Sequence, residues 1–500
     1  MIKKRLILIG ILVLLSAALV VGGIWLSGVE LLSPEENPDY QFGFQYEFGE
    51  KIRIFSFSSK NIDYLEVTNA HGNYRVRMED NQVYIVNYEN VPLLAASSAG
   101  LFNSGQTLRL ETVIAENCQD MDDFGLEKPQ ATVNIQAYSG ATAKFHIGDM
   151  SPNHDYYYMC VDGERTVYLI DTLLAERYLK SVTEYCDRKI YKCFVPFDDL
   201  TSLSIKSPSV EYAFRLTTEE EYKKGGIYFG GVAMDKPYAW GGDASAIESL
   251  MGTMTELTAT SVAAVCVEEK DLAQYGLDAA SRTEVLLKVK ADPNPTMYNN
   301  KTNPYFDSSL PTGEKVDFDV TYWIGNVTET EVYVMFDNRA VVYTMPRDTF
   351  YWLDWKPYQF CARLLHGEYL ADLSQLILRT PEDVWTFDIA NANSNDKDEL
   401  RVQCGNVAVN NNLFRNFYTM LIGLYPSGEG IKPEGDVLPD LEIEYKRLDG
   451  VSNFVRFYAM DARNYAAEVN GVTFLSVRVT EIQKVLSDLQ KILKGQDIIM

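Results

Sequence analysis

The chain has 500 residues, too many for one ordinary domain and enough for about three domains of average size. Hydrophobic residues make up 46% and charged residues 23% of the sequence, as in globular proteins, so the composition excludes a disordered chain and a coiled coil. The 45 basic and 70 acidic residues give a net charge of −25, and no cluster of Lys and Arg is present to neutralise phosphates, which excludes nucleic acid as the main partner.

The first element in chain order is an apolar segment at residues 6–26 that carries no charged side chain. A helix of this length rises about 30 Å, the thickness of the hydrocarbon core of a bilayer. Three basic residues at 3–5 precede the segment, and residues 27–50 carry only acidic charges. The positive-inside rule therefore predicts a single transmembrane anchor, with residues 1–5 as a cytoplasmic tip and the bulk of the chain outside.

A cleaved signal peptide is the alternative interpretation, because Ser16, Ala17 and Ala18 resemble a cleavage site. The apolar run continues to Leu26, further than the core of a signal peptide, so we favour an uncleaved anchor. A lipoprotein is excluded because the first cysteine, Cys118, lies far beyond the run. Without the three basic residues of the tip, 42 basic and 70 acidic residues give the exported part a net charge of −28.

An internal repeat organises the chain beyond the juxtamembrane linker at residues 27–50. Two stretches share an ordered series of motifs: a [FY]-Gly-Leu-[ED] turn, a strand ending in Ile-Gly-[DN], and a Val-Tyr strand before a helix. The copies are Phe124–Glu127 and Tyr275–Asp278, Ile147–Asp149 and Ile324–Asn326, and Val167–Tyr168 and Val342–Tyr343. Because the order is kept, we infer two versions of one structural unit.

A third, divergent copy follows, with strand-like runs at 438–445 and 469–474 and an apolar stripe at helical spacing over 482–493. The predicted units span residues 51–195, 196–370 and 371–496. Short alternating strands bounded by Gly, Asp or Asn predict mostly antiparallel sheets, and the apolar stripes predict packed helices. The predicted fold class is α+β: an N-terminal transmembrane helix followed by three related units.

These motifs and the anchor resemble the domain-of-unknown-function 4340 family of bacterial membrane-anchored proteins, over most of residues 50–360. In that family Pro commonly follows the Gly-Leu turn, as Pro129 does here, whereas the second copy has Ala279 and Ala280. The resemblance implies a single-pass protein of the bacterial cytoplasmic membrane that works beside the ATP-binding and permease subunits of an ABC transporter. The family lends no catalytic residue.

Two patterns in the sequence are candidates for a catalytic or a metal site. Ala96–Gly100 is a near match to the G-x-S-x-G nucleophile elbow, and we expect it to be a small-residue stretch of the first unit's helix instead. His146, Asp149, His154 and Asp155 form the one His/carboxylate cluster of the sequence. Because the repeat places Trp323 where His146 stands, we expect a packing or surface role for this histidine.

Neighbouring acids at 122–123 and 198–199 are expected in solvated turns rather than in acid–base catalysis. The chain has no Gly-rich phosphate-binding motif, so we expect no nucleotide, and the glycine pairs between 225 and 242 are expected in loops around an exposed hairpin. We therefore predict no catalytic residue, no metal and no cofactor.

The seven cysteines are odd in number and include no C-x-x-C pair, so they indicate no metal knuckle. Cys186 and Cys193 are a possible disulfide, although we favour separate thiols. The cysteines stand at positions 118, 160, 186, 193, 266, 361 and 404.

Aromatic clusters remain as the candidates for contact with a ligand or partner, provided that they are exposed. The candidate contact residues are Tyr156, Tyr157, Tyr158, Trp352 and Trp355. We expect a non-enzymatic, extracytoplasmic accessory protein that contacts the bilayer through residues 6–26 and binds an ABC-transporter permease or another envelope protein. The alternative is an extracytoplasmic binding protein for a glycan or another envelope ligand.

Overall fold

The computed structural model describes residues 52–110, 112–192, 195–224, 226–228, 230–292, 314–337, 340–362, 364–394 and 397–498. The predicted tip, anchor and linker lie outside these residues, and no helix within them is long and apolar enough to cross a membrane. The chain forms two compact units. The first holds Ala95–Val182 and the residues before Tyr88, and the second holds Tyr88–Leu94 and the residues from Thr183 onward.

The first unit is built on an eight-stranded sheet of order β4-β3-β2-β7-β8-β9-β10-β6, with helices α2 (Ala95–Ser104) and α3 (Thr172–Leu179). Alternate residues of β7 are buried because one face of the sheet carries the helices. The guanidinium of Arg177 on α3 donates to the carbonyl oxygen of Gly100 on α2 at 2.9 Å, which joins the two helices. Strands β1 (Ile52–Ser56) and β5 (Thr107–Leu110) pair separately. The strands of the sheet are β2 (Ile62–Asn69), β3 (Gly72–Glu79), β4 (Gln82–Ile85), β6 (Thr112–Ala115), β7 (Ala131–Ala137), β8 (Thr142–Met150), β9 (Tyr156–Val161) and β10 (Val167–Asp171).

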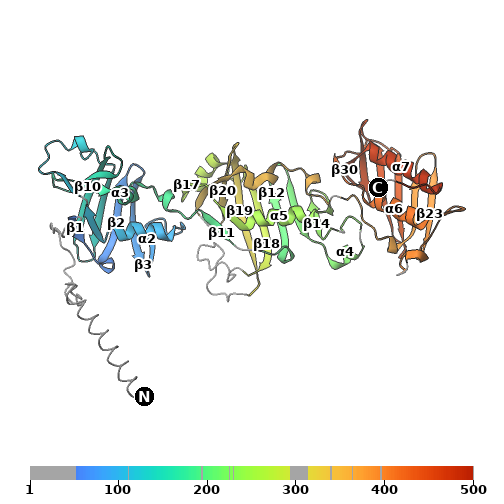
Figure 1. Ribbon diagram of the computed structural model, residues 1–500, viewed down its shortest axis with the longest axis horizontal. Coiled ribbons are helices and arrows are strands. Elements are labelled where there is room, and N and C mark those ends of the chain that lie inside the picture. The colour runs from blue at the N-terminus through green and yellow to red at the C-terminus, as the bar shows by residue number, and fades with distance from the viewer. Residues whose placement is uncertain are drawn as a thin grey trace, which may run out of the picture. The chain divides into compact units, whose positions relative to one another are not determined.

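The second unit begins with a nine-stranded sheet of order β15-β14-β13-β12-β18-β19-β20-β21-β17. Helix α5 (Ala244–Thr255) lies across one face of this sheet (Figure 1), and its residues Ile247, Leu250 and Met254 are buried there. Strands β11 (Lys189–Lys192) and β16 (Glu256–Thr258) pair separately. The strands of the sheet are β12 (Leu200–Lys206), β13 (Glu211–Leu216), β14 (Val232–Lys236), β15 (Trp240–Gly241), β17 (Ser261–Val265), β18 (Thr283–Ala291), β19 (Val316–Val327), β20 (Glu331–Phe336) and β21 (Val341–Pro346).

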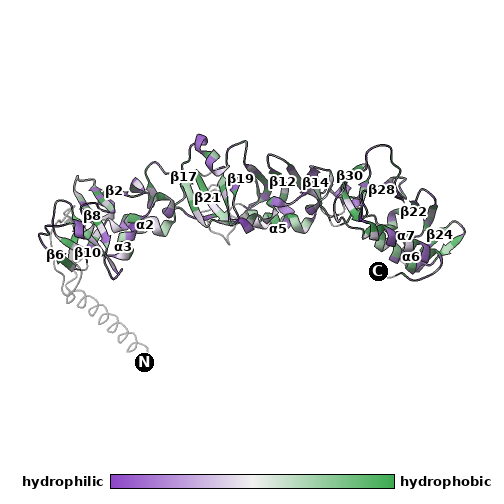
Figure 2. Cartoon of the chain, turned by 90° about the horizontal axis from the view of Figure 1, so that it is seen from above, coloured by the Kyte–Doolittle hydropathy of each residue, from purple (hydrophilic) through white to green (hydrophobic). Residues whose placement is uncertain are grey.

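A second nine-stranded sheet completes this unit, with the order β25-β24-β23-β22-β27-β28-β29-β30-β26. Helices α6 (Asn411–Ile422) and α7 (Val479–Leu493) carry both hydrophobic and hydrophilic residues (Figure 2). The stripe of Ile482, Val485, Leu489 and Ile492 is buried, which confirms the helical spacing seen in the sequence. The strands are β22 (Leu373–Arg379), β23 (Val384–Ala390), β24 (Arg401–Cys404), β25 (Val407–Val409), β26 (Gly428–Glu429), β27 (Leu441–Arg447), β28 (Ser452–Ala459), β29 (Asn464–Val469) and β30 (Val472–Arg478).

The three sheets follow one plan. In each, an opening meander leads to a helix, which is followed by a short outer strand and then by a four-stranded meander. The last strand of the second meander pairs with the short outer strand, as β10 with β6, β21 with β17 and β30 with β26. The first strands of the two meanders pair antiparallel at the centre, as β2 with β7, β12 with β18 and β22 with β27. The α+β class with mostly antiparallel sheets and the repeated segments are confirmed.

One feature differs from the sequence-based expectation. The second sheet closes with a kinked 3-10 segment, η7 (Arg347–Asp354), where we expected an α-helix as in the other two copies. The second and third sheets share one continuous hydrophobic core within the second compact unit. The unit boundaries that we expected at 195/196 and 370/371 stay predictions.

Candidate functional site

The recurrent motifs of the first unit hold a turn against a strand end. Gly125 follows the 3-10 turn η2 (Asp122–Phe124) and has a φ of 67°, a left-handed conformation that residues with a side chain rarely adopt. A Cβ there would overlap the carboxylate of Asp149, and a Cβ on Gly148 would overlap the carbonyl oxygen of Phe124. The two glycines therefore let turn and strand end touch directly, a contact that we call the clasp.

The second unit repeats the clasp. Gly276 also has a φ of 67°, and its Cβ would overlap the side chain of Asn326. The amide of Asn326 donates to the carbonyl oxygen of Gln274 at 3.2 Å. In both copies the aromatic residue of the turn packs edge-on against a tyrosine of the meander, with centroid distances of 4.9 Å for Phe124–Tyr158 and 5.2 Å for Tyr275–Tyr333. These motifs are thus structural.

The predicted contact aromatics are separated by the fold. Tyr157 and Trp352 are buried, so both are core residues and do not meet the condition of exposure that a contact role requires. Tyr158 packs on Phe124 within the clasp, and Tyr156 is half-buried at the start of β9. Trp355 is half-buried at the end of η7, and of the five it is the one that lines a groove of the second unit.

This groove has a volume of about 610 Å³, within the range of small-molecule binding sites. One wall comes from the segment after η7 and the other from the segment after α6, and α5 contributes its first turn. The groove is lined by Asp243, Ala246, Trp355, Tyr358, Gln359, Cys361, Ala362, Leu364, Gly423, Tyr425 and Pro426. We refer to it as the Trp355 groove.

Backbone and ring contacts fix Trp355 in place. Its amide donates to the carbonyl oxygen of Trp352 at 3.0 Å, and its own carbonyl oxygen accepts from the hydroxyl of Tyr212 at 3.0 Å. The indole packs edge-on with Tyr351 at 5.4 Å and with Phe360 at 5.1 Å between centroids. Trp355 is therefore held in one orientation before any ligand arrives.

The opposite wall is held as firmly. The amide of Leu365 donates to the carbonyl oxygen of Leu424 at 3.0 Å, and the amide of Ser427 donates to that of Ser476 at 2.8 Å. Tyr425 and Pro426 lie between these two bonds, and Tyr425 is 56% exposed. Two adjacent backbone anchors thus present an exposed aromatic ring to the groove.

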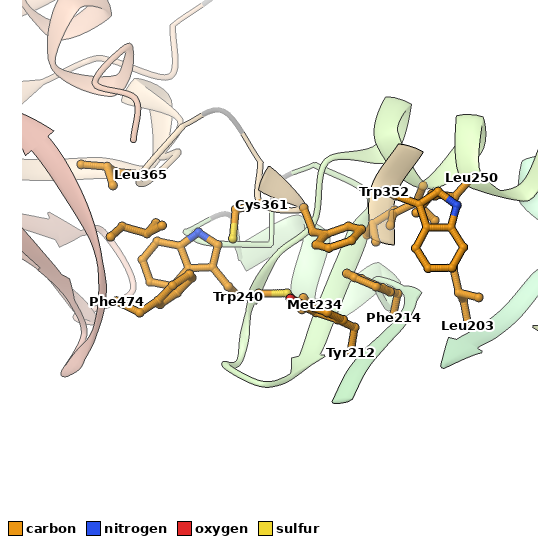
Figure 3. Close-up of a cluster of buried hydrophobic side chains, with 14 of the residues drawn as sticks. Leu203, Tyr212, Phe214, Met234, Trp240, Leu250, Trp352, Cys361, Leu365 and Phe474 are labelled. Carbon is orange, nitrogen blue, oxygen red and sulfur yellow. The ribbon is translucent and has the colours of Figure 1, made fainter. Parts of the chain in front are cut away.

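Buried residues join the second and third sheets (Figure 3). Trp240 lies between Phe474 on one side and Cys361 and Met234 on the other, with its ring edge-on to Phe474 at 5.1 Å. Gly241 and Gly242, beside it, are buried, which overturns our expectation of loops around an exposed hairpin. The physical reason is contact with chain far away in sequence: Gly242 forms a β-bridge with Cys361.

A buried ionic cluster lies at the same junction. The side chain of Glu368 is 0% exposed and accepts from Nη1 of Arg447 at 2.6 Å and from the amide of Asn453 at 2.5 Å. His366 is buried beside it, with Nε2 3.5 Å from Oε1 of Glu368. Burial raises the pKa of Tyr418, whose hydroxyl donates to the carbonyl oxygen of Glu368 at 2.8 Å. The residues of this cluster are separated along the chain, and no sequence pattern predicted that they meet.

The His/carboxylate cluster seen in the sequence does not converge. His146 lies between the hydroxyl of Thr132 at 3.0 Å and the carboxylate of Asp162 at 2.7 Å. The hydrogen bond from His146 lowers the pKa of Asp162. Asp149 belongs to the clasp, and Nδ1 of His154 faces the sulfur of Met150 at 2.9 Å. Among the residues that the structure describes, no group of three His, Cys, Asp or Glu side chains could hold a metal ion.

The remaining patterns take structural positions. Ser98 lies buried in α2 and donates to the carbonyl oxygen of Ala95 at 3.3 Å, so the expected helix is confirmed. Asp122 and Asp123 sit exposed in the turn before the clasp. Asp198 is exposed too, whereas the side chain of Asp199 is 11% exposed and pairs with Lys315 at 2.5 Å, which corrects the solvated-turn expectation for that residue.

The cysteines of the described chain are free thiols at positions 118, 160, 186, 266, 361 and 404, and Cys193 lies outside the described residues. Burial raises the pKa of Cys160 to about 11 and that of Cys186 to about 12. Neither thiol is therefore ionised at neutral pH, so neither is an activated nucleophile.

No curated protein and no solved structure shows a significant match to this chain. One family model does match, over residues 84–227 and 233–420, which together make up more than half of the chain. Its two segments include both copies of the clasp in the first and second sheets. The chain therefore belongs to the family described as Domain of unknown function (DUF4340).

Proposed function

We propose that this chain is a non-enzymatic, membrane-anchored, extracytoplasmic accessory protein that associates with an ABC transporter. The observation that carries the proposal is the clasp: the repeated motifs within the two segments that match the family hold a turn against a strand end instead of converging on a reactive centre. A scaffold of repeated sheets offers an extended surface for a partner. The anchor predicted at residues 6–26 would keep that surface beside a permease.

The acidic charge of the exported part supports the same arrangement. A body of net charge −28 is repelled by anionic headgroups, so one anchor holds it at the membrane without the body lying flat on the lipid. Contact with a second membrane protein is then the means by which such a body reaches a defined position.

In-cell cross-linking tests the proposal. The full chain carries a photoreactive residue at the exposed position Tyr369, and the cross-linked species are purified from detergent-solubilised membranes and identified by mass spectrometry. We expect a permease subunit among them. The matched control replaces residues 6–26 by an unrelated single span of the same length and orientation, which separates contacts of the exported body from those of the anchor. A chain that is abundant in the membrane fraction yet yields no permease adduct would contradict the proposal.

The second candidate is an extracytoplasmic binding protein for a glycan or another envelope ligand. The Trp355 groove favours it, because rigidly held aromatic side chains line a cavity of ligand size. Binding of a small ligand by the purified chain, without any transporter present, would distinguish this function from the first.

A further inference from the structure

A surface loop of the third sheet holds the most exposed apolar side chains of the described chain. The loop covers residues 431–440 and lies between β26 and β27. Ile431 is 79% and Leu438 is 78% exposed, more than any other large hydrophobic side chain that the structure describes. We refer to this segment as the Ile431 loop. Single exposed hydrophobic residues are ordinary on a protein surface, so the arrangement of these two decides whether they form a patch.

Both ends of the loop are held at one corner of the sheet, where β28 ends at Ala459. The amide of Ile431 donates to the sulfur of Met460 at 3.5 Å. At the other end, the amide of Ala459 donates to Oδ2 of Asp440 at 2.9 Å, and the amide of Asp440 donates to the carbonyl oxygen of Phe457 at 2.9 Å. A compact surface loop whose ends lie close together is an Ω-loop, and loops of this kind are frequently functional.

The closure of the loop gathers its apolar side chains. Ile431 contacts the exposed Met460, and Leu438 stands two residues before the second anchor, Asp440. Two residues of extended chain span at most about 7 Å, so the Cα of Leu438 lies close to the corner that also holds Ile431. Val437, which precedes Leu438, is exposed as well. These four apolar residues therefore form one exposed patch, and such patches mark interaction sites.

The basic side chains beside the patch are engaged within the protein. The loop and the turn at residues 459–464 together contain four carboxylates and two basic side chains. One of the two is Lys432, whose ammonium lies 3.0 Å from the carboxylate of Glu468 and 4.3 Å from the centre of the Tyr458 ring. The other is Arg463, whose amide donates to the carboxylate of Asp461 at 2.6 Å, so the charges of these two neighbours offset each other.

Two carboxylates of the loop are left to meet a partner. Glu434 and Asp436 stand exposed between Ile431 and Leu438, and neither forms an ion pair with a residue that the structure describes. Asp440, in contrast, is used as an anchor of the loop. The patch is therefore apolar with an acidic rim. Apolar contact surrounded by charges of opposite sign is the complementarity by which protein surfaces recognise each other.

We propose that the Ile431 loop docks a protein segment in which apolar side chains stand beside Lys or Arg. The proposal rests on the first proposed function for the presence of a protein partner, and it names the surface that holds that partner. An anionic lipid surface is disfavoured because its headgroups repel Glu434 and Asp436. A second copy of this chain is disfavoured because a symmetric contact would bring the acidic rim against itself.

Cross-linking in intact cells from the loop itself tests the proposal. The full chain carries the photoreactive residue at position 437, which leaves Ile431 and Leu438 in place, and the cross-linked peptide is sequenced by mass spectrometry. We expect adducts with a protein segment that contains apolar residues next to Lys or Arg. Adducts with lipid, with a second copy of the chain or with a segment without Lys and Arg would overturn the proposal, and so would the absence of adducts.

Variants of this chain separate the apolar contact from the charge. Leu438→Ala truncates an exposed side chain, which the fold tolerates, and should lower the adduct yield about tenfold. Glu434→Lys reverses a charge of the rim and should lower the yield about threefold. The matched controls, Leu173→Ala and Glu382→Lys, make the same changes at exposed positions outside the loop and should leave the yield unchanged. Equal loss in a variant and its control would refute the assignment, and urea denaturation verifies that each variant is folded.

The association with a transporter and the docking surface fail separately. Permease adducts from position 369 without any adduct from position 437 would leave the first proposed function standing and overturn the docking surface. Adducts from position 437 with an apolar and basic segment of a protein that is not a transporter subunit would support the docking surface and contradict the association with a transporter.

Discussion

Arg447→Met removes the cationic partner of Glu368 and leaves a buried carboxylate in place. The side chain of Glu368 is 0% exposed and that of Arg447 is 11% exposed, so the pair is screened little by water. Burial lowers the pKa of Arg447, but the charge of Glu368, the hydrogen bond to Glu368 and the contacts with Asp449 together raise it above its ordinary value. Breaking a buried pair from one side costs about 3–5 kcal/mol.

Two further contacts adjust this figure. Nη1 of Arg447 also donates to the carbonyl oxygen of Lys224 at 2.9 Å, a bond that adds about 1 kcal/mol to the loss. The side-chain amide of Asn453 still donates to Glu368 at 2.5 Å, and this hydrogen bond reduces the cost of the carboxylate that has lost its cationic partner. We therefore expect the free energy of unfolding of the second unit to fall by about 4 kcal/mol. Urea denaturation of the full chain, followed by tryptophan fluorescence because Trp240 lies at this junction, measures the change.

The control is Arg456→Met. Arg456 pairs with Glu442 at 2.6 Å and with Glu468 at 2.9 Å, but its side chain is 30% exposed, so we expect a loss of about 1 kcal/mol. A double variant, Arg447→Met with Glu368→Met, replaces the buried pair by apolar side chains and should regain much of the lost stability. If Arg447→Met cost no more than Arg456→Met, or if the double variant were as unstable as the single one, the reasoning about the buried carboxylate would be refuted.

Two other predictions concern the clasp and an acid-sensitive pair. Gly125→Ala should destabilise the first unit by at least about 2 kcal/mol in urea denaturation, because a left-handed φ and an overlap with Asp149 act together. Gly140→Ala shares the positive φ, 90°, but meets nothing within 4 Å, so it should cost about half as much; equal losses would mean that the overlap is unimportant. The hydrogen bond from Arg215 lowers the pKa of Glu221 to about 2, below its ordinary value of 4.5, so the stabilisation is complete above pH 4.5 and is lost as the pH falls toward 2. Because the pair is partly solvated, Glu221→Gln should remove only about 1 kcal/mol of the difference between urea unfolding at pH 5 and at pH 3, and an unchanged difference would contradict the assignment.

The meanders were predictable because their signals are local. The alternation of residue types along β7, which matches its alternating burial, and the recurring Gly-Leu turns each involve only a few consecutive residues. These local patterns indicated antiparallel strands in the right order. The apolar stripe of α7 is equally local. Periodicity therefore sufficed for the class of the fold and for its repetition.

The site was predictable only in part. Trp352 and Trp355 are three residues apart, yet the first is buried in the core and the second lines the groove, and composition alone does not say which side of such a short kinked segment faces inward. Tyr425 reaches the groove from the third copy, through backbone bonds that no local pattern encodes. The burial of Gly241 was not predictable either, because it depends on contact with a segment that is distant in the sequence.

The way each sheet ends bears on how a partner can attach. In the three large sheets of the described chain, the six outermost strands are short: β4 and β6 have four residues, β15 and β26 have two, β25 has three and β17 has five. Short outer strands give an incoming chain few backbone groups with which to extend a sheet. Strand addition, a common way of capturing an extended peptide, is thus poorly supported. Side chains on the faces and loops of the sheets therefore offer a partner more contacts than the strand edges do.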